Sequence, residues 1–275
     1  TLDISLNAQI AGGGVTALAL QADGKLVVGG QFTSAAGFSR SFLQRFNAAG
    51  DFDNNYNPSV DAPVTALALQ ADGKLIVGGD FTQLQPAGDT SPTARLRLAR
   101  VRANGTLDET FDPRANNITH AIVVQPDGKI LIGGHFTTLQ PNGAGAPTTR
   151  NYLARLNNDG TLDAFNPGAD GPVNTLSLQA DGKIVVGGLF TSIAGTSRSY
   201  LARLNNDGTV DTSFNVYADN YVNTVVQQPD GKTIVGGAFP NIGGQPRVGL
   251  ARLISTGAVN SALVASSDRT SVTWT

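Results

Sequence analysis

The stretch VNTLSLQADGKIVVGGLF, from Val173 to Phe190, decides the fold of this chain. Apolar and polar residues alternate up to the Asp-Gly-Lys triplet at Asp181, and a second apolar run then ends in a Gly pair. An alternation of period two is typical of a β-strand. Asp-Gly between two such runs predicts a tight hairpin, because glycine accepts the positive φ that a type I′ turn requires. The stretch therefore predicts two antiparallel strands.

The same pattern recurs along the whole chain. The triplet begins at Asp23, Asp72, Asp127, Asp181 and Asp230. A third apolar run, such as NYLARLN from Asn151, and a fourth short element, such as TLDETF from Thr106, complete each copy. Repeats of about 50 residues with four strands each are typical of β-propeller blades. We therefore predict an all-β propeller of five four-stranded blades, with repeats at approximately 12–56, 61–111, 115–165, 170–214 and 219–263.

These motifs resemble the bacterial delta-60 repeat. The order V-x-A-L, then Q-x-D-G-K, an apolar run and G-G-x-F-T, then L-A-R-L-N-x-D-G-T-L-D, is similar to that family's pattern over almost the whole chain. The Gly-Gly strands are more distantly similar to kelch blades, whose later aromatic signature this sequence lacks. The resemblance implies a β-propeller from a large exported or cell-surface protein, in a family whose roles are not assigned.

Both ends of the chain fall inside a repeat. Thr1–Asn7 has the pattern of a fourth element, and Ser271–Thr275 has that of a first strand. We expect one domain over residues 1–275, in which residues 1–11 and 264–275 close the ring or pair with a neighbouring subunit. The alternative is six blades, with a partial sixth built from the two ends. The chain starts at Thr1 without an initiator Met or a signal sequence, which indicates a processed form or a fragment.

Composition excludes several classes of function. The net charge of −2 and the pI of about 5.6 offer no general attraction for nucleic acid or anionic lipid. The absence of cysteine excludes disulfides and thiolate metal sites. No apolar run reaches the 18 or so residues that a membrane span needs, so no membrane insertion is expected. Few lysines and glutamates among many Gly, Asn and Thr residues favour a secreted or cell-surface bacterial protein.

Nearly every cation belongs to the repeat. The lysines are Lys25, Lys74, Lys129, Lys183 and Lys232, and the repeated arginines are Arg45, Arg100, Arg155, Arg203 and Arg252 and, five residues earlier, Arg40, Arg95, Arg150, Arg198 and Arg247. A residue present in every copy is more economically part of the scaffold than a unique active-site group. We expect Arg155 and its equivalents to bond the Asp of the following element, such as Asp163, in a partly buried pair.

The loops that enter the first strands carry the candidate metal ligands. Asp61, Asp170 and Asp219 occupy these loops, with Asn117 and Gly13 at the corresponding places in the other two repeats. In a propeller these loops share a face with the loops between strands two and three, so the carboxylates could surround one mouth of a central channel. One hypothesis is that they bind a hard cation such as Ca²⁺, or sugar hydroxyls. The alternative, which we favour, is that each Asp completes its local turn.

The loops between strands two and three carry the candidate partner-binding residues. Residues 83–95 and 138–150 are long and rich in Pro, Gly and Ala, whereas the other three loops are short. Binding residues usually lie in loops that vary while the scaffold stays constant, although loops also tolerate insertions that have no function. The candidates are Gln83, Gln85, Asp89, Arg95, Gln140, Asn142 and Arg150.

The sequence favours binding over catalysis. The two histidines, His120 and His135, occupy positions that hold ordinary residues in the other repeats, and no nucleophile elbow, metalloprotease motif or phosphate loop occurs. We therefore expect a non-enzymatic binding or scaffolding propeller, without a cofactor, that contacts a protein or a glycan. One alternative is a structural subunit that self-associates through its terminal strands. Another is a polysaccharide hydrolase or lyase that uses the three aspartates.

Overall fold

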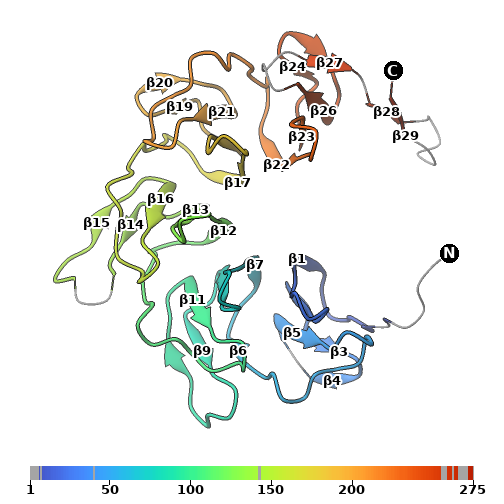
Figure 1. Ribbon diagram of the computed structural model, residues 1–275, viewed down its shortest axis with the longest axis vertical. Helices are drawn as coiled ribbons and strands as arrows, with labels where there is room; N and C mark the ends of the chain where they lie inside the picture. Colours follow the sequence, from blue (N-terminus) through green and yellow to red (C-terminus); the bar gives the residue numbers. More distant parts are fainter. Residues whose placement is uncertain are drawn as a thin grey trace. The chain divides into compact units, whose positions relative to one another are not determined.

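The computed structural model describes residue 6, residues 8–39, 41–141 and 144–254, and the backbone of three short strands between residues 259 and 274. Its elements are β-strands joined by turns and loops (Figure 1). The chain divides into two compact units within the third repeat. The first unit comprises residues 1–130, 136–149 and 156–162, and the second comprises 131–135, 150–155 and 163–275. Within the described part of the chain, no helix is long and apolar enough to cross a membrane.

Each of the first two repeats folds into a three-stranded antiparallel sheet in the first unit. Their strands are β1 (Val15–Leu20), β2 (Leu26–Gly30) and β5 (Leu43–Phe46), then β7 (Val64–Leu69), β8 (Leu75–Gly79) and β11 (Leu98–Val101). The third repeat adds β12 (Thr119–Val124), which lies beside β7, and β7 in turn lies beside β1. The first strands of successive repeats are therefore neighbours.

The second unit repeats this arrangement. It holds most of β13 (Ile130–Gly134) and β16 (Leu153–Leu156), then β17 (Val173–Leu178), β18 (Ile184–Gly188) and β21 (Leu201–Leu204), and finally β22 (Val222–Gln227), β23 (Thr233–Gly237), β26 (Leu250–Leu253) and β27 (Val259–Ser261). Strand β17 packs beside β22. The strands predicted around each Asp-Gly-Lys turn are confirmed in both units.

The predicted fourth element of each repeat pairs with the third strand, but its length differs between repeats. Among the described residues it forms a full strand in the fifth repeat, β27, which pairs with β26. In the others the fourth element makes a single bridge, such as Val101 with Leu107 or Leu204 with Val210. The following aspartate explains the early end, because Asp108 Oδ1 accepts a hydrogen bond from the backbone N–H two residues later and turns the chain away.

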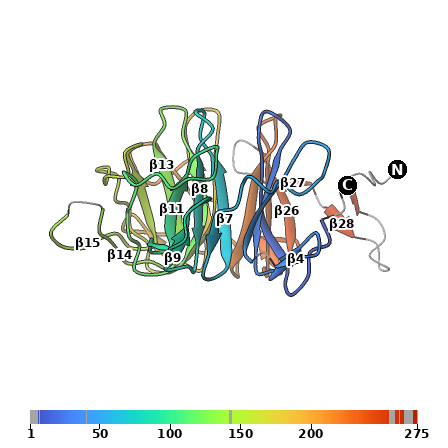
Figure 2. The same ribbon diagram turned by 90° about the horizontal axis from the view of Figure 1, so that it is seen from below.

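A second small sheet in every repeat was not predicted. The loop between strands two and three folds into an outer hairpin, formed by β3 (Ser34–Ala35) and β4 (Phe38–Ser39), β9 (Gln83–Gln85) and β10 (Thr93–Ala94), β14 (Thr138–Leu139) and β15 (Thr148–Thr149), β19 (Ser192–Ile193) and β20 (Thr196–Ser197), and β24 (Asn241–Ile242) and β25 (Gln245–Pro246). The segment that enters each repeat pairs with this hairpin, as β6 (Ser59–Val60) does with β9. In the first unit the outer hairpins lie along the lower edge of Figure 2.

This pairing corrects the role predicted for the start of the chain. Ala11 forms a bridge with Ser34, and the backbone N–H of Ala36 donates to the carbonyl of Ala8. Residues 8–11 therefore belong to the first repeat, and residues 1–5 and 7 lie outside the described residues. Near the other end, β29 (Val272–Trp274) pairs with β28 (Leu263–Ala265), so the predicted terminal strand exists with a local partner.

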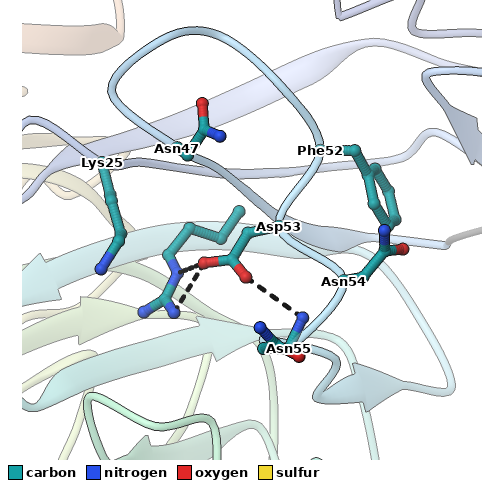
Figure 3. A pocket seen from close by; sticks show the side chains of 7 residues that line it. Lys25, Asn47, Phe52, Asp53, Asn54 and Asn55 are labelled. Atoms are coloured by element: carbon teal, nitrogen blue, oxygen red, sulfur yellow. Dashed lines mark hydrogen bonds and ion pairs between the residues drawn. The ribbon is translucent and has the colours of Figure 1, made fainter.

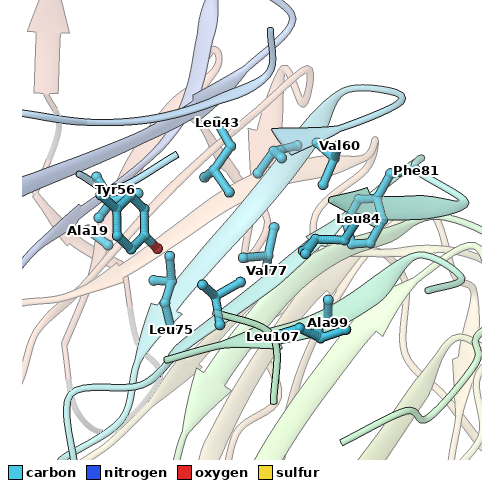
Figure 4. Close-up of a cluster of buried hydrophobic side chains, with 13 residues drawn as sticks. Ala19, Leu43, Tyr56, Val60, Leu75, Val77, Phe81, Leu84, Ala99 and Leu107 are labelled. Atoms are coloured by element: carbon cyan, nitrogen blue, oxygen red, sulfur yellow. The ribbon is translucent and has the colours of Figure 1, made fainter. Parts of the chain in front are cut away.

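The apolar core lies between the sheets of successive repeats. In the first unit, Ala19 and Leu43 from the first repeat meet Leu75 and Val77 from the second (Figure 4). The second unit has an equivalent cluster around Val222. Because every repeat buries one sheet face against its neighbour, the repeats form a chain of similar junctions rather than one central core.

Candidate functional site

Asp61 caps the outer hairpin of its own repeat. Its carboxylate accepts hydrogen bonds from the backbone N–H groups of Thr82 and Gln83, at 2.8 and 3.0 Å, and from Thr82 Oγ1 at 2.5 Å. Burial raises the pKa of the Asp61 carboxyl, but these hydrogen bonds outweigh it and bring the pKa below its ordinary value. Both carboxylate oxygens are thus engaged with the hairpin, which supports the turn interpretation.

The other two candidate carboxylates do the same. Asp170 accepts from the N–H groups of Thr191 and Ser192 at 2.8 and 2.9 Å, and Asp219 accepts from the backbone and side-chain N–H groups of Asn241 at 3.0 and 2.5 Å. Among the described residues, no group of three or more His, Asp or Glu side chains is arranged to hold a metal ion. Binding of Ca²⁺ by these carboxylates stays a prediction.

The equivalent positions in the remaining repeats lie one residue earlier than predicted. Asn116, not Asn117, places its side-chain oxygen on two consecutive backbone N–H groups that begin at Thr137. The bridge of the preceding residue to the hairpin fixes this register, and in the first repeat it selects Gly12 rather than Gly13. An amide thus performs the same capping as a carboxylate, so the negative charge is not what the turn requires.

The long hairpin of the second repeat presents only some of its predicted residues. Gln85 Nε2 donates to the carbonyl of Asp89 at 2.8 Å and closes the hairpin loop, while Gln83 is exposed. Arg95 is only 6% exposed, and its Nη1 lies 3.8 Å from Asp112 Oδ2. Arg95 is therefore a buried residue of the scaffold, which does not favour the predicted contact with a partner.

The long hairpin of the third repeat has a similar closure. Gln140 Nε2 donates to the carbonyl of Ala144 at 3.2 Å, four residues on, as in the second repeat. Asn142 lies outside the described residues. Arg150, in the second unit, is partly buried and donates through Nη2 to the carbonyl of Asp163 at 3.2 Å, so a scaffold contact engages part of its guanidinium.

The tips of the two long hairpins are the exposed parts of these loops. Residues 88–92 in the second repeat and residues 145–149 in the third are all exposed. The fourth repeat instead joins β19 to β20 through only Ala194 and Gly195, both with positive φ, as a type I′ turn requires. The hairpins of the second and third repeats are therefore longer than that two-residue turn.

A hollow of about 550 Å³ opens at the Asp-Gly-Lys side of the first repeat (Figure 3). Its lining residues are Lys25, Arg45, Asn47, Phe52, Asp53, Asn54 and Asn55. Lys25 Nζ pairs with Asp23 at 2.8 Å, whereas the equivalent Lys183 Nζ of the fourth repeat pairs with Asp211 at 2.8 Å. The hollow offers amide and ammonium donors, but its carboxylate is already bound by Arg45.

The predicted pair of Arg155 with Asp163 is confirmed, and it is part of a larger contact. Arg155 Nε lies 2.8 Å from Asp163 Oδ1, Nη1 donates to the carbonyl of Asn206 in the next repeat at 2.8 Å, and the guanidinium lies 4.7 Å from the Phe165 ring centroid. Arg45 and Arg100 make the same kinds of contact. These arginines therefore join successive repeats.

The aspartate of this contact has a strongly shifted acidity in the fourth repeat. Burial raises the pKa of Asp211, yet hydrogen bonds from Lys183, Ser213 and Arg203 outweigh that effect and hold the pKa well below its ordinary value. A carboxyl group that ionises so readily is a poor proton donor at neutral pH. This arrangement suits a structural ion pair better than acid catalysis.

A family comparison accounts for the repeats. Residues 21–56, 70–111, 125–165, 179–214 and 228–262 match the model of a β-propeller domain of unknown function, DUF5122. The chain belongs to the DUF5122 β-propeller family. Each DUF5122 match starts just before an Asp-Gly-Lys triplet, and the matches confirm a β-propeller repeat family and the fold of five propeller blades. No curated protein matches the chain.

Solved structures share the DUF5122 propeller fold at low identity. A protein of unknown function from Bacteroides caccae is 11% identical, with a TM-score of 0.50 over 90% of this chain and 80% of its own. Virginiamycin B lyase from Staphylococcus aureus is 14% identical, with a TM-score of 0.57 over 93% and 71%. The Pan2 WD40 domain of Neurospora crassa is 13% identical, with a TM-score of 0.56 over 90% and 64%. These likenesses concern the fold alone.

Sequence reasoning missed the outer hairpins and the hollow of this DUF5122 chain. The hairpins do have a signal, because Ala194-Gly195 and Gly243-Gly244 are dipeptides that favour a two-residue turn with positive φ. The sequence signal for the hollow is weaker. Asn55 occupies the position that Thr110 has in the second repeat and Ser213 in the fourth. Both of those hydroxyls bond the neighbouring aspartate, whereas Asn55 offers only its backbone N–H.

Proposed function

We propose that this chain is a non-enzymatic binding module of a secreted or cell-surface bacterial protein, and that it contacts a protein or glycan through its two long outer hairpins. The observation that carries the proposal is the difference in length between outer hairpins that are built on the same repeat scaffold. Residues 88–92 and 145–149 are exposed, whereas the equivalent hairpin of the fourth repeat closes with two residues. Exposed variable loops on a rigid scaffold are where binding residues concentrate.

The hydrogen bonds within the long hairpins support a role in recognition rather than an insertion without a function. The glutamine bonds within each loop, Gln85 to Asp89 and Gln140 to Ala144, hold the base of the tip. Asp61 and Asn116 fix the start of each hairpin to the segment that enters the repeat. A loop that is ordered before binding loses less conformational entropy when it binds.

The alternative of a polysaccharide hydrolase or lyase has less support. Such an enzyme needs one carboxylic acid that can donate a proton and a second carboxylate that acts as base or nucleophile. Asp61, Asp170 and Asp219 each accept hydrogen bonds from their own hairpin, and these bonds lower the pKa of each carboxyl. Groups with lowered pKa values are unsuited to the acid role at neutral pH.

The proposal is tested by a glycan array and a pull-down from bacterial cell surfaces with the purified chain. In one variant, residues 85–92 are replaced by Ala-Gly, which copies the two-residue turn of the fourth repeat, and in a second variant residues 140–147 are replaced in the same way. We expect saturable binding that either replacement weakens at least tenfold. The control is Ser197→Ala, an exposed change on the short hairpin, which should leave binding unchanged.

Circular dichroism and the unfolding temperature must first show that both trimmed chains are folded. Binding that survives both replacements in folded chains would contradict the proposal, as would the absence of any bound partner. Turnover of a bound polysaccharide that is lost in Asp61→Asn or Asp170→Asn chains would support the enzymatic alternative instead.

A further inference from the structure

A second hollow, of about 270 Å³, opens in the first unit between the second and third repeats. The third repeat contributes the base of its long hairpin and the turn that follows its third strand, and the second repeat contributes the end of its fourth element. The lining residues are Thr110, Asp112, Pro141, Asp159, Gly160 and Thr161. We call this space the Asp112 hollow.

Asp112 is the buried charged residue of the Asp112 hollow. Its side chain is only 4% exposed. Oδ2 accepts a hydrogen bond from Arg114 Nε at 2.7 Å, and Arg95 Nη1 lies 3.8 Å from the same oxygen. Oδ1 accepts no hydrogen bond from the described residues. Because a buried carboxylate oxygen without a partner is unfavourable, a donor in the hollow would complete the hydrogen bonding of Asp112.

The carboxylate at this position is particular to the second repeat. The first, third and fourth repeats have asparagine there, namely Asn57, Asn166 and Asn215. Asn57 is half-buried and the other two are exposed, whereas Asp112 is buried. The repeat scaffold therefore does not require a carboxylate at this position, and its presence in a hollow calls for a local reason.

The charges of the Asp112 hollow favour a neutral ligand that donates hydrogen bonds. Asp159 Oδ1 accepts from the side-chain hydroxyl and the backbone N–H of Thr161, at 2.6 and 2.9 Å, and these bonds lower the pKa of Asp159. Two ionised carboxylates thus line the hollow and repel an anion. Arg114 and Arg95 lie beside Asp112 and balance its charge, which disfavours a metal ion.

We propose that the Asp112 hollow binds one ring of a neutral sugar, with a hydroxyl group that donates to Asp112 Oδ1. This proposal rests on the proposed function and names a glycan as the partner. Pro141 and Gly160 are buried and give the C–H groups of a sugar ring an apolar surface. Drug-sized ligands occupy pockets of about 300–1,000 Å³, so the smaller Asp112 hollow suits a single ring.

The test is saturation-transfer NMR with three neutral sugars, glucose, galactose and mannose, and with the uronic acid of each. At least one neutral sugar should bind, and its uronic acid should bind about tenfold more weakly because the two carboxylates repel it. Asp112→Asn should weaken binding of the neutral sugar about tenfold, since a neutral oxygen is a poorer acceptor. The variant should fold, because three other repeats have asparagine at this position.

Thr110→Trp places a large side chain at the edge of the hollow and should abolish binding of the sugar. Its matched control is Ser213→Trp at the equivalent position of the fourth repeat. Both substitutions remove a hydroxyl that bonds the neighbouring aspartate, and Ser213 does not line the Asp112 hollow. The control should therefore bind the sugar like the unmodified chain.

The proposal would be overturned if no neutral sugar bound, or if a uronic acid bound as well as its neutral partner. Sugar binding that persists in Asp112→Asn and Thr110→Trp chains would also overturn it, as would Ca²⁺ binding that requires Asp112 in a chain that binds no sugar.

The hairpin variants separate this proposal from the proposed function. A partner that is lost when residues 85–92 are replaced, but not in Asp112→Asn, would overturn the sugar site and leave the role of the hairpins standing. Sugar binding that requires Asp112, in a chain whose binding of partners survives both hairpin replacements, would support the sugar site and contradict the role of the hairpins.

Discussion

At the residue scale, the repeated arginine joins one repeat to the next. In each of the first three repeats one guanidinium meets an aspartate of its own repeat, an aromatic ring and a backbone carbonyl of the next repeat. The planar guanidinium has donors in several directions, whereas a lysine ammonium is a compact point charge. This geometry explains why arginine, and not lysine, occupies the position.

Arg100 and Arg102 provide a direct test, because both pair with Asp108. Arg100 Nε lies 2.9 Å from Asp108 Oδ2 and its side chain is 4% exposed, whereas Arg102 Nη2 lies 3.5 Å from Asp108 Oδ1 and its side chain is 45% exposed. Arg100→Ala should lower the free energy of unfolding by about 3 kcal/mol or more, because it leaves a buried carboxylate without its main partner. Arg102→Ala should cost at most about 1 kcal/mol.

Urea unfolding followed by circular dichroism measures both changes. Equal losses of unfolding free energy for the two variants would show that burial of the ion pair does not determine its contribution to stability.

At the scale of the elements, the glycine pair at the end of the second strand sets how closely neighbouring sheets approach. The first glycine receives a side chain of the next repeat. The second lies against the backbone of its own first strand, since a Cβ on Gly188 would lie 2.1 Å from the carbonyl oxygen of Pro172. The second glycine thus allows two backbone segments to approach closely, while the first makes room for a side chain.

Gly133→Ala tests the space that the first glycine leaves for a side chain of the next repeat, which we call the glycine slot. Its Cβ would lie 2.5 Å from Val173 Cγ1, so the substitution should overpack the junction and cost about 1–3 kcal/mol of unfolding free energy. Val173→Ala removes the clashing methyl groups, and the double variant should therefore lose less than the sum of the two single variants, by about 1 kcal/mol.

The matched control for the slot is Gly145→Ala, where a Cβ would meet nothing within 4 Å and which should change stability by less than about 0.5 kcal/mol. If the double variant loses as much unfolding free energy as the two single variants together, the side chain of Val173 does not depend on the glycine slot.

The sequence predicted the strands around each Asp-Gly-Lys turn because alternation and turn chemistry are local. It also predicted the pair of Arg155 with Asp163, since both residues recur at a fixed separation. It could not predict that Arg95 is buried, because burial depends on which side of the hairpin packs against Asp112, far along the chain. The register of Asn116 was missed for a similar reason, since a bridge to the hairpin sets it.

At the scale of the whole molecule, stability is built from contacts between neighbours in the sequence of repeats. Within each unit, neighbouring repeats pack their sheets on one another, and the buried apolar side chains form clusters at these junctions. In such proteins the stability is approximately a sum of terms for the repeats and their junctions.

The glycine slot and the arginine contact also bear on how such a chain can change its length over evolution. Every repeat carries both halves of the junction: a valine or its equivalent on one face, and a glycine and an arginine on the other. An in-frame duplication of one unit therefore inserts a copy that already matches the neighbours on both sides. Genes for this architecture can gain or lose units by recombination between copies, without any new contact having to arise by mutation.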